Sequence, residues 1–373
     1  MENIYLDYNA STPLDPGVKE AMLPLMDAHF GNPSASHYAA MGAKKAVETA
    51  RKQVAGLINS TAGEIIFTSG GTESNNHVLK GVLQSSKDKG NHIVTTNIEH
   101  PAIGNTCKFL EGEGADVTYV PVDETGRVDP LAIEEAITEN TILVTVMHAN
   151  NETGMIQPIK EISEICKRSQ VYFHTDAAQS AGKVPIDVQD AQVDFLSLAG
   201  HKLYAPKGIG ALYIREGIEI ESLVHGAGHE MGKRAGTENV ILAAGLGKAC
   251  ELAKRSEGEQ ERIKKLRDYF WVELKTSFGE DISLNGKLNH LLPNTLNVNF
   301  HHRAGQDVLQ AVPEIAASTG SACHAGSVDL SPVLRAMGVE EERGMGAVRF
   351  SLGRFTTKEE IDQALSLLKT RIQ

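Results

Sequence analysis

Cysteine is scarce in this chain and shows no pairing. The 373 residues contain only four cysteines, Cys107, Cys166, Cys250 and Cys323, and no two of them form a Cys-x-x-Cys pair. This spacing indicates neither a disulfide framework nor a structural zinc site. Cys166 and Cys250 occur in apolar helical patterns, so we expect them to be buried. Small residues surround Cys323, which leaves it as the candidate nucleophile.

Basic residues and long apolar runs are scarce as well. Lys and Arg total 36 against 48 Asp and Glu, for a formal net charge of −12, whereas a nucleic-acid-binding surface needs clustered basic residues. No stretch approaches the ~18 apolar residues that would cross a membrane. The N-terminal residues Met-Glu-Asn-Ile-Tyr-Leu-Asp lack both the basic start and the apolar core of a signal peptide. We expect a cytoplasmic protein that binds neither nucleic acid nor membranes.

Strand-like and helix-like segments alternate along much of the chain. Strand-like runs occupy residues 92–96, 116–120, 141–147, 171–175 and 194–198, and helical ones lie near 101–111, 129–137 and 158–168. This alternation predicts an α/β fold with a mainly parallel, doubly wound sheet, in which ligands bind beyond the carboxyl ends of the strands. At about 100–200 residues per domain, the length predicts two or three units. We expect a large domain over residues 14–255 and a smaller α+β domain made of residues 1–13 and 256–373, with the boundary in the charged stretch near Lys254.

One lysine stands where a strand of this sheet ends. After the apolar run that ends at Leu198, the chain continues Ala-Gly-His to Lys202 and then enters a Pro- and Gly-rich loop. A partly desolvated lysine amine has a lowered pKa and is nucleophilic, so Lys202 is a candidate for Schiff-base chemistry. A solvated loop lysine is the alternative, because most lysines are exposed.

A candidate anion site comes earlier in the chain. A strand-like run from Glu64 is followed by Gly70-Gly71-Thr72 and a helical segment, and helix N-termini offer free N–H groups to anions. The glycine spacing matches neither a nucleotide triphosphate loop nor a dinucleotide loop, which favours the phosphate of a small cofactor. A glycine turn with a threonine N-cap and no ligand is the alternative.

Polar residues recur at the ends of other predicted strands. His100, Asn151 and Asp176 each follow such a strand. Taken singly, His100 could cap a helix, Asn151 could hold a turn and Asp176 could be an N-cap. Together with Lys202 and the Gly-Gly-Thr turn they describe a pyridoxal phosphate site, with a carboxylate for the ring nitrogen and a histidine for the ring face.

A series of short motifs runs through nearly the whole chain. They are Leu6-Asp-Tyr-Asn-Ala, Phe30-Gly-Asn-Pro-Ser, Thr68-Ser-Gly-Gly-Thr-Glu-Ser-Asn, Glu99-His-Pro-Ala, Asn151-Glu-Thr-Gly, His174-Thr-Asp-Ala-Ala-Gln, Gly200-His-Lys, Pro206-Lys-Gly-Ile-Gly, Arg234-Ala-Gly-Thr-Glu-Asn, Ser318-Thr-Gly-Ser-Ala-Cys and Val348-Arg-Phe-Ser-Leu-Gly-Arg-Phe-Thr-Thr. In this order they resemble the motifs of the cysteine desulfurases, in the class V aminotransferase family of pyridoxal-phosphate enzymes of fold type I.

The resemblance implies roles for particular residues. The catalytic residues would be Lys202, which bonds the cofactor pyridoxal 5'-phosphate, the thiol of Cys323, and His100. Further cofactor contacts would come from Gly71, Thr72, Asn151, Asp176, Gln179 and His201, and Thr237 would reach the phosphate of the partner subunit in a homodimer. Arg349 would bind the carboxylate of the substrate L-cysteine with both ends of its planar fork, with Asn9 and Asn151 nearby.

The implied reaction converts L-cysteine to L-alanine and leaves a persulfide on Cys323. Sulfur would then pass to an acceptor protein for iron–sulfur cluster assembly or thiolation. The resemblance implies no metal site of the chain's own, although a cluster on a scaffold protein could share Cys323. Two alternatives are open: a selenocysteine lyase or cysteine sulfinate desulfinase, and a weakly active protein that mainly docks sulfur acceptors.

Two positions depart from the family pattern. Ala199 stands three residues before the lysine, where a serine hydroxyl often faces the phosphate, so we expect one hydrogen bond of the phosphate site to be missing. Cys323 is followed by His324-Ala-Gly-Ser, where desulfurases commonly have small hydroxyl residues. This departure leaves open the preference between cysteine and selenocysteine and the role of His324.

Overall fold

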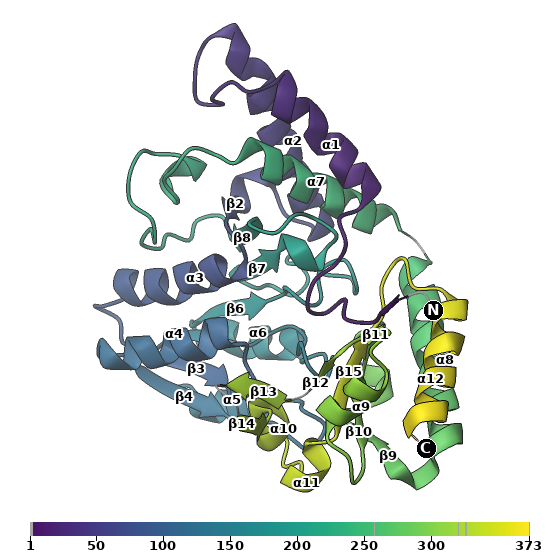
Figure 1. Cartoon of the computed structure of the whole chain (residues 1–373). Coiled ribbons are helices and arrows are strands. Elements are labelled where there is room, and N and C mark those ends of the chain that lie inside the picture. Colours follow the sequence, from purple (N-terminus) through teal and green to yellow (C-terminus); the bar gives the residue numbers. More distant parts are fainter. Residues whose placement is uncertain (1–2, 257, 320, 325–326, 373) are drawn as a thin grey trace.

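A large central sheet and a smaller unit of strands and helices lie side by side (Figure 1). The computed structural model describes residues 3–256, 258–319, 321–324 and 327–372, without the side chains of residues 321–328. Both the first and the last described residues belong to the smaller unit.

The central sheet is mixed but mostly parallel. Its strands, in spatial order, are β2 (Ile65–Thr68), β8 (Gly210–Ile214), β7 (Phe195–Ala199), β6 (Tyr172–Asp176), β5 (Thr141–Thr145), β3 (His92–Thr96) and β4 (Asp116–Val120). The run from β7 to β4 is parallel, whereas β8 is antiparallel to both of its neighbours. The predicted α/β class and mainly parallel sheet are confirmed, and β3 and β4 begin and end at the predicted residues.

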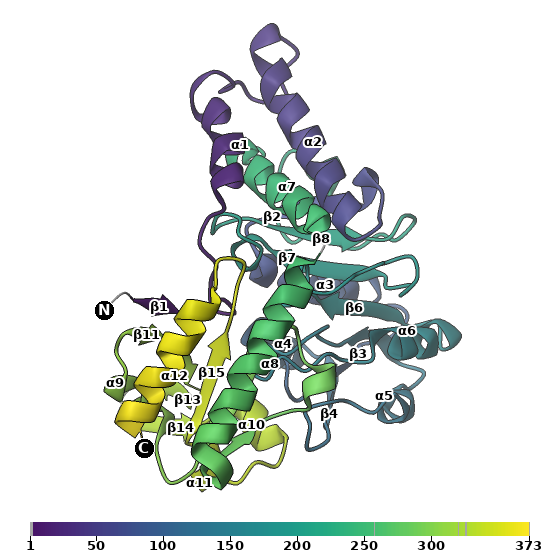
Figure 2. The ribbon, with the colours of Figure 1, turned by 90° about the vertical axis from the view of Figure 1, so that its right-hand side faces the viewer.

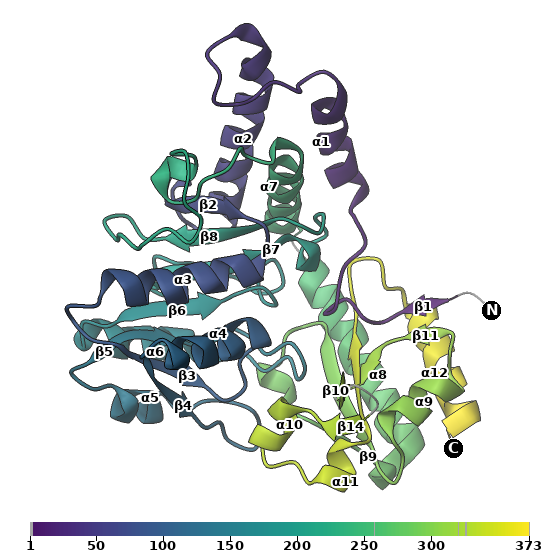
Figure 3. The same cartoon turned by 60° about the vertical axis from the view of Figure 1, so that its left-hand side comes forward.

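Helices flank this sheet on both faces. They are α1 (Pro16–Asp27), α2 (Met41–Leu57), α3 (Gly71–Ser85), α4 (Pro101–Gly112), α5 (Pro130–Ala136), α6 (Ile159–Arg168) and α7 (Val240–Arg255). Figure 3 shows α3 and α4 together on the near face, with α1, α2 and α7 grouped beyond the β2 edge. The short 3-10 turn η3 (Gly200–Lys202) follows β7 directly.

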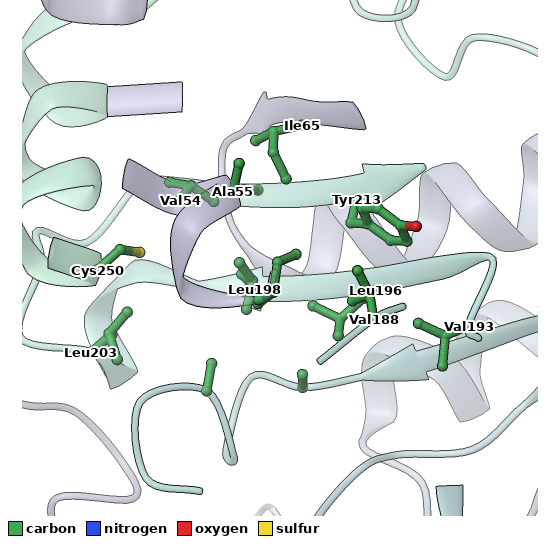
Figure 4. Close-up of a cluster of buried hydrophobic side chains, with 14 of the residues drawn as sticks. Val54, Ala55, Ile65, Val188, Val193, Leu196, Leu198, Leu203, Tyr213 and Cys250 are labelled. Carbon is green, nitrogen blue, oxygen red and sulfur yellow. The ribbon is translucent and has the colours of Figure 1, made fainter. Parts of the chain in front are cut away.

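The inner strands of the central sheet are buried on both faces, whereas the edge strand β4 is largely exposed. Alternate side chains of a strand point to opposite faces, so the two faces pack in different clusters. On β7, Leu196 and Leu198 pack in one cluster with Val54 of α2 (Figure 4). Phe195 packs in a separate cluster with Val78 of α3. This two-sided burial explains why the sequence of β7 is a continuous apolar run rather than an alternating one.

The smaller unit is built on an antiparallel sheet with the order β12 (Ser318–Thr319), β15 (Ala347–Ser351), β10 (Thr295–Phe300) and β9 (Ile282–Leu284). The other elements are β1 (Ile4–Tyr5), which pairs with β11 (Ile315–Ala316), the hairpin of β13 (Ser321–His324) and β14 (Ser327–Leu330), and the helices α8 (Glu259–Phe278), α9 (Gly305–Ala311), α10 (Pro332–Ala336), α11 (Glu341–Gly344) and α12 (Lys358–Ile372). In Figure 2, α8 and α12 lie side by side along this sheet.

The smaller unit has its own core, in which Ile4 and Leu6 of the N-terminal arm pack with residues of α8, β10, β15 and α12. We propose that it comprises residues 1–13 and 256–373, with the boundary between α7 and α8. No helix in the described ranges combines the length and the apolar character that a membrane crossing requires.

The loop after β5 joins the two units. β5 ends at Thr145, two residues before the predicted end, and Met147 N donates to Glu99 Oε1 (2.9 Å) instead of to a neighbouring strand. Further along the loop, Met155 forms a β-bridge with Leu291 of the smaller unit. The carboxyl ends of the parallel strands therefore meet the smaller unit, which is where open α/β sheets bind ligands.

Candidate active site

A pocket of about 340 Å³ lies at this junction. Its wall combines the N-terminal arm, the start of α3, the loops that follow β3, β5, β6 and β7, and a side chain of β15. The predicted residues that line it are Asn9, Gly71, Thr72, His100, Asn151, Asp176, Gln179, His201, Lys202 and Arg349. Segments far apart in the sequence thus converge at the carboxyl ends of the strands, as predicted.

Lys202, in the turn η3, is held inside the pocket. Its Nζ donates to the backbone oxygens of Asn9 (2.5 Å) and Ala10 (2.7 Å), so it is not a solvated loop lysine. Burial, together with the positive charge of Arg349, lowers the pKa of Lys202 to about 8, although nearby carboxylates act in the opposite direction. An amine with this pKa is partly neutral near pH 7, as nucleophilic chemistry requires.

Two histidines of the pocket have lowered pKa values. Burial and the positive charges of Lys202 and Lys207 lower the pKa of His201 to about 4. Burial also lowers the pKa of His100, whose Nδ1 accepts a hydrogen bond from Ala102 N (3.1 Å) as the N-cap of α4. The capping role considered for His100 is therefore correct, and the same side chain also lines the pocket.

The start of α3 forms the anion-binding end of the pocket. The N-cap is Gly70 and no side chain caps the helix, so the alternative of a threonine N-cap is wrong, and Thr72 lines the pocket instead. A Cβ on Gly210 of β8 would lie 2.7 Å from the Gly70 backbone, which is why the close approach of this turn to β8 needs glycine. Uncapped N–H groups and the helix dipole make this end suitable for a phosphate.

Asp176, the last residue of β6, is a buried carboxylate in the pocket wall. Its Oδ2 accepts from Asn75 Nδ2 (2.7 Å) and its Oδ1 accepts from Ala178 N (2.9 Å). The second bond lies in a turn, and no helix starts there, so the alternative of a helix N-cap is wrong. Asn75 was not predicted from the sequence, although its position three residues after Thr72 on one helix places both on the same face.

Arg349 reaches the pocket from β15. Its Nη1 donates to Asn151 O (2.9 Å), and its Nη2 donates to Asp7 Oδ1 (2.7 Å) and Ser318 Oγ (3.1 Å). Its buried Nε has no hydrogen-bond partner among the described residues. A guanidinium that is held in place and retains a free N–H is suited to bind a planar carboxylate.

Asn151 lies in the loop after β5, where it was expected either to hold a turn or to contact a ligand. The turn is held by Asn150, whose Oδ1 accepts from the backbone nitrogens of Glu152 (2.8 Å) and Thr153 (3.0 Å). The side chain of Asn151 is not needed for that turn and lines the pocket.

A buried lysine behind the pocket wall, Lys183, was missed in the sequence analysis. Its Nζ donates to Asn9 Oδ1 (3.2 Å) and Gln179 Oε1 (3.1 Å). The Nδ2 of Asn9 donates to Asn151 O (3.3 Å) and Thr295 Oγ1 (2.9 Å), so protein partners already occupy this carboxamide. A contact between Asn9 and substrate therefore stays a prediction. The spacing of four residues between Gln179 and Lys183 is the signal that could have identified the lysine.

Two predicted residues do not appear in the pocket lining. Thr237 is exposed, in a loop that Arg234 ties to Glu73 of α3 through bonds of 2.8 and 3.2 Å. The backbone of Cys323 lies in β13, but its side chain and that of His324 lie outside the described residues, so their roles stay predictions. Among the side chains that are described, no group of three or more His, Cys, Asp or Glu is arranged to hold a metal ion.

The fold and the pocket together define a class of enzyme. A mostly parallel sheet with a partly buried lysine after one strand, an aspartate at the end of another and an anion-binding helix start are the features of pyridoxal-phosphate enzymes of fold type I. The sequence profile of the family described as "Aminotransferase class-V" matches residues 4–364. The chain belongs to this family.

Curated relatives and solved structures agree with this membership. The chain is 46% identical over 373 residues to "Cysteine desulfurase IscS" of Dictyoglomus turgidum, covering 99% of this chain and 94% of the relative. It is 47% identical over 375 residues to the protein of the same name from Shewanella oneidensis, covering 99% and 92%. A solved "NifS-like protein" has a TM-score of 0.93 at 36% identity over 99% of both chains. Another, "SspA in complex with cysteine", has a TM-score of 0.84 at 39% identity over 95% of this chain and 100% of that one. The resemblance inferred from the motifs is confirmed.

The pocket fits pyridoxal 5'-phosphate, the cofactor of this family. Lys202 supplies the amine that would bond it, and the buried Asp176 supplies a carboxylate for its ring nitrogen. The phosphate would lie at the start of α3, where Gly71 has no Cβ to fill the space.

Ala199, the last residue of β7, lines the pocket beside this phosphate end. A Cβ on Gly71 would lie 3.5 Å from Ala199 Cβ, so a hydroxyl at position 199 would be added next to the helix start. We expect Ala199→Ser to gain a hydrogen bond of about 1 kcal/mol and to lose cofactor about fivefold more slowly. The measurement is cofactor retained during dialysis, with Ala199→Gly as the control without a hydroxyl. Equal or faster loss from Ala199→Ser would contradict this account.

Proposed function

We propose that this protein is a cysteine desulfurase, which converts L-cysteine to L-alanine and leaves the sulfur as a persulfide on Cys323. The observation that carries the proposal is the convergence of Lys202, Asp176 and Arg349 in one pocket. The names of the relatives support the reaction, and the cysteine complex of a structural neighbour supports the substrate.

The residues of the pocket have different roles in the reaction at the substrate α-carbon. Pyridoxal phosphate, when bound, supplies an electron sink for the bonds to that carbon. Lys202 Nζ takes the proton from the α-carbon and returns a proton later, which its lowered pKa of about 8 permits near neutral pH. Asp176, oriented by Asn75, would hold the proton on the ring nitrogen, and His100 would face the ring.

Arg349 orients the substrate by its carboxylate. The guanidinium is fixed by Asp7, Ser318 and the backbone of Asn151, and the unpartnered Nε–H provides a donor for a carboxylate oxygen. Because Arg349 is buried, a bound carboxylate would also be shielded from water, which strengthens the charge pair.

Cys323 removes the sulfur. Its thiolate attacks the sulfur of L-cysteine, a sulfur–sulfur bond forms, and the carbon–sulfur bond breaks with its electron pair staying on the three-carbon fragment. That fragment is protonated and leaves as L-alanine. L-cysteine plus one thiol thus gives L-alanine plus one persulfide, without an external oxidant or reductant.

A comparison of substrates tests this function. Purified holoenzyme would receive L-cysteine, L-selenocysteine or cysteine sulfinate, and alanine, sulfide, selenide, sulfite and protein-bound persulfide would be measured. We expect alanine and persulfide from L-cysteine. If alanine formed only from L-selenocysteine, the protein would be a selenocysteine lyase instead. If sulfite were the main product, it would be a cysteine sulfinate desulfinase. Turnover that stays negligible even with a thiol acceptor would leave only the docking role.

A homodimer is part of the same proposal. Large apolar side chains are exposed between α1 and α2, among them Phe30 (81% exposed) and Tyr38 (87% exposed). Large exposed apolar side chains favour association, and in a dimer Thr237 would reach the cofactor phosphate of the partner subunit. A mass measured in solution that corresponds to a single chain at micromolar concentration would contradict this part of the proposal.

A sulfur-acceptor protein, such as an iron–sulfur scaffold, is the second proposed partner, because the sulfur of a persulfide on Cys323 must be removed before the next turnover.

We propose that the reaction takes place in the cytoplasm. The three cysteines whose side chains are described, Cys107, Cys166 and Cys250, are free, and a nucleophilic thiol persists best in a reducing compartment.

Cofactor uptake by the cofactor-free protein should depend on pH through Lys202. Only the neutral amine bonds the cofactor, and burial lowers the pKa of Lys202 to about 8. We therefore expect the uptake rate to rise about tenfold per pH unit below pH 8 and to level off above it. The uptake rate can be measured by stopped-flow absorbance between pH 6 and 10, in steps of about one pH unit. A rate that keeps rising to pH 10 would mean an ordinary, solvated lysine.

A further inference from the structure

Lys183 is a buried lysine directly behind the pocket wall that the proposed mechanism does not use. Its side chain is 9% exposed, and no carboxylate pairs with it within the described part of the chain. Its Nζ instead donates to Gln179 Oε1 (3.1 Å) and Asn9 Oδ1 (3.2 Å). An amine buried without a counter-ion is costly, so its position needs an explanation.

The amine determines which way the Gln179 carboxamide points. Lysine only donates hydrogen bonds, so the atom of Gln179 that faces Lys183 must be the oxygen. The nitrogen is then directed away, where Nε2 donates one N–H to Asn9 O (2.9 Å). No described residue accepts the second N–H, and Gln179 lines the pocket. If the Gln179 carboxamide were reversed, its NH2 group would face the Lys183 amine and its oxygen would face the backbone oxygen of Asn9, and neither pair could form a hydrogen bond.

The same amine fixes the carboxamide of Asn9. Asn9 Oδ1 accepts from Lys183 and from Asn294 Nδ2 (3.0 Å), which leaves Nδ2 to donate to the protein. The backbone oxygen of Asn9 accepts from Gln179 and also from Lys202 Nζ (2.5 Å). Asn9 therefore connects the buried amine to the reactive one, and the whole group forms one hydrogen-bonded network.

The charge of Lys183 does not have to be permanent for this role. Burial and the positive charges of Lys202 and Arg349 lower the pKa of Lys183 to about 7. Either form of the amine can donate two N–H groups, which is the number that its two carboxamide acceptors need. Its function in the network is thus to donate hydrogen bonds in a fixed direction.

We propose that Lys183 is a positioning residue, which orients the Gln179 and Asn9 carboxamides from behind the pocket so that a Gln179 N–H is presented to the bound cofactor. The inference rests on the proposed pyridoxal phosphate site. Lys183 does not line the pocket, whereas Gln179 does, so the effect of Lys183 on the cofactor would pass through Gln179.

Lys183→Met tests this role, because methionine fills a similar volume and donates no hydrogen bond. We expect a shift in the absorption band of the bound cofactor and loss of cofactor about fivefold faster than in wild type, as for one lost buried hydrogen bond. Lys207→Met, which removes the same charge from an exposed position in the next loop, is the matched control and should match wild type. Should Lys183→Met not fold, Lys183→Leu, which also donates no hydrogen bond, serves the same comparison.

A double-mutant cycle separates positioning from general destabilisation. In a Gln179→Leu background, Lys183→Met should add little to the spectral shift or to the rate of cofactor loss, because Gln179, the acceptor through which Lys183 acts on the cofactor, is gone. Additive effects would overturn the proposal, as would a Lys183→Met spectrum identical to that of Lys207→Met. If wild type itself bound no pyridoxal phosphate, the proposed function would fail, which is a distinguishable result.

Discussion

Lys202→Ala is expected to hold pyridoxal phosphate without a covalent bond and to lose desulfurase activity by at least about 10²-fold. The amine of Lys202 both bonds the cofactor and moves the α-carbon proton in the proposed mechanism. Its burial and its bonds to the Asn9 and Ala10 oxygens set it apart from surface lysines. Borohydride reduction of the holoenzyme followed by peptide mapping should place the label on Lys202.

Two other lysines provide the controls for this experiment. Lys207 is exposed five residues further along the chain, and Lys207→Ala should keep both the label and the activity. Lys183 is close by but is buried behind Asn9 and Gln179 and should stay unlabelled. A label on either residue in wild type would refute the assignment of Lys202.

Cys323→Ala is expected to keep the coloured cofactor and to bind L-cysteine, yet to form no persulfide and little alanine. We expect this result because two residues carry out the two steps. Lys202 moves protons at the α-carbon, whereas only a thiolate can accept the sulfur as a nucleophile. Absorbance reports substrate binding, and mass spectrometry of the intact chain reports the persulfide as one added sulfur.

Cys107→Ala is the matched control for Cys323. Burial raises the pKa of the Cys107 thiol to about 12, so this cysteine stays protonated and should not take up sulfur. Wild-type alanine formation by Cys323→Ala would exclude the desulfurase mechanism and favour a lyase that eliminates the β-substituent directly. L-selenocysteine should be assayed beside L-cysteine, because its weaker carbon–selenium bond could break without the thiol.

The pocket residues that could be predicted are those whose local sequence already has the required pattern. Asp176 ends one strand, Lys202 lies in the short turn after another, and Gly71 is the first residue of a helix. Ligand sites at strand ends and helix starts can be recognised from such short segments. The residues that hold them were missed. Asn75 binds Asp176 across 101 residues of sequence and Lys183 binds Asn9 across 174, separations that no local pattern encodes. Only the contact of Lys183 with Gln179, four residues apart, had a local signal.

Alternatives at single positions were decided only by three-dimensional contacts. His100 proved to be both a helix cap and a pocket residue. The turn assigned to Asn151 is held by Asn150, because Asn150 Oδ1 is the atom within reach of two backbone N–H groups. Both residues are asparagines in one loop, and turn preference alone does not distinguish them.

The sequence by itself determined the class of fold and the family, and it selected Lys202 as the candidate for the reactive lysine. Apolar periodicity and short motifs are local features, which can be recognised without knowing how the chain packs. The tertiary structure decided the charge state and direction of the groups in the pocket. Burial near Arg349 lowers the pKa of Lys202, and the pairing of Arg349 with Asp7 joins the C-terminal sheet to the N-terminal arm. Desolvation and charge proximity depend on which distant segments meet, and only the folded chain brings those segments together.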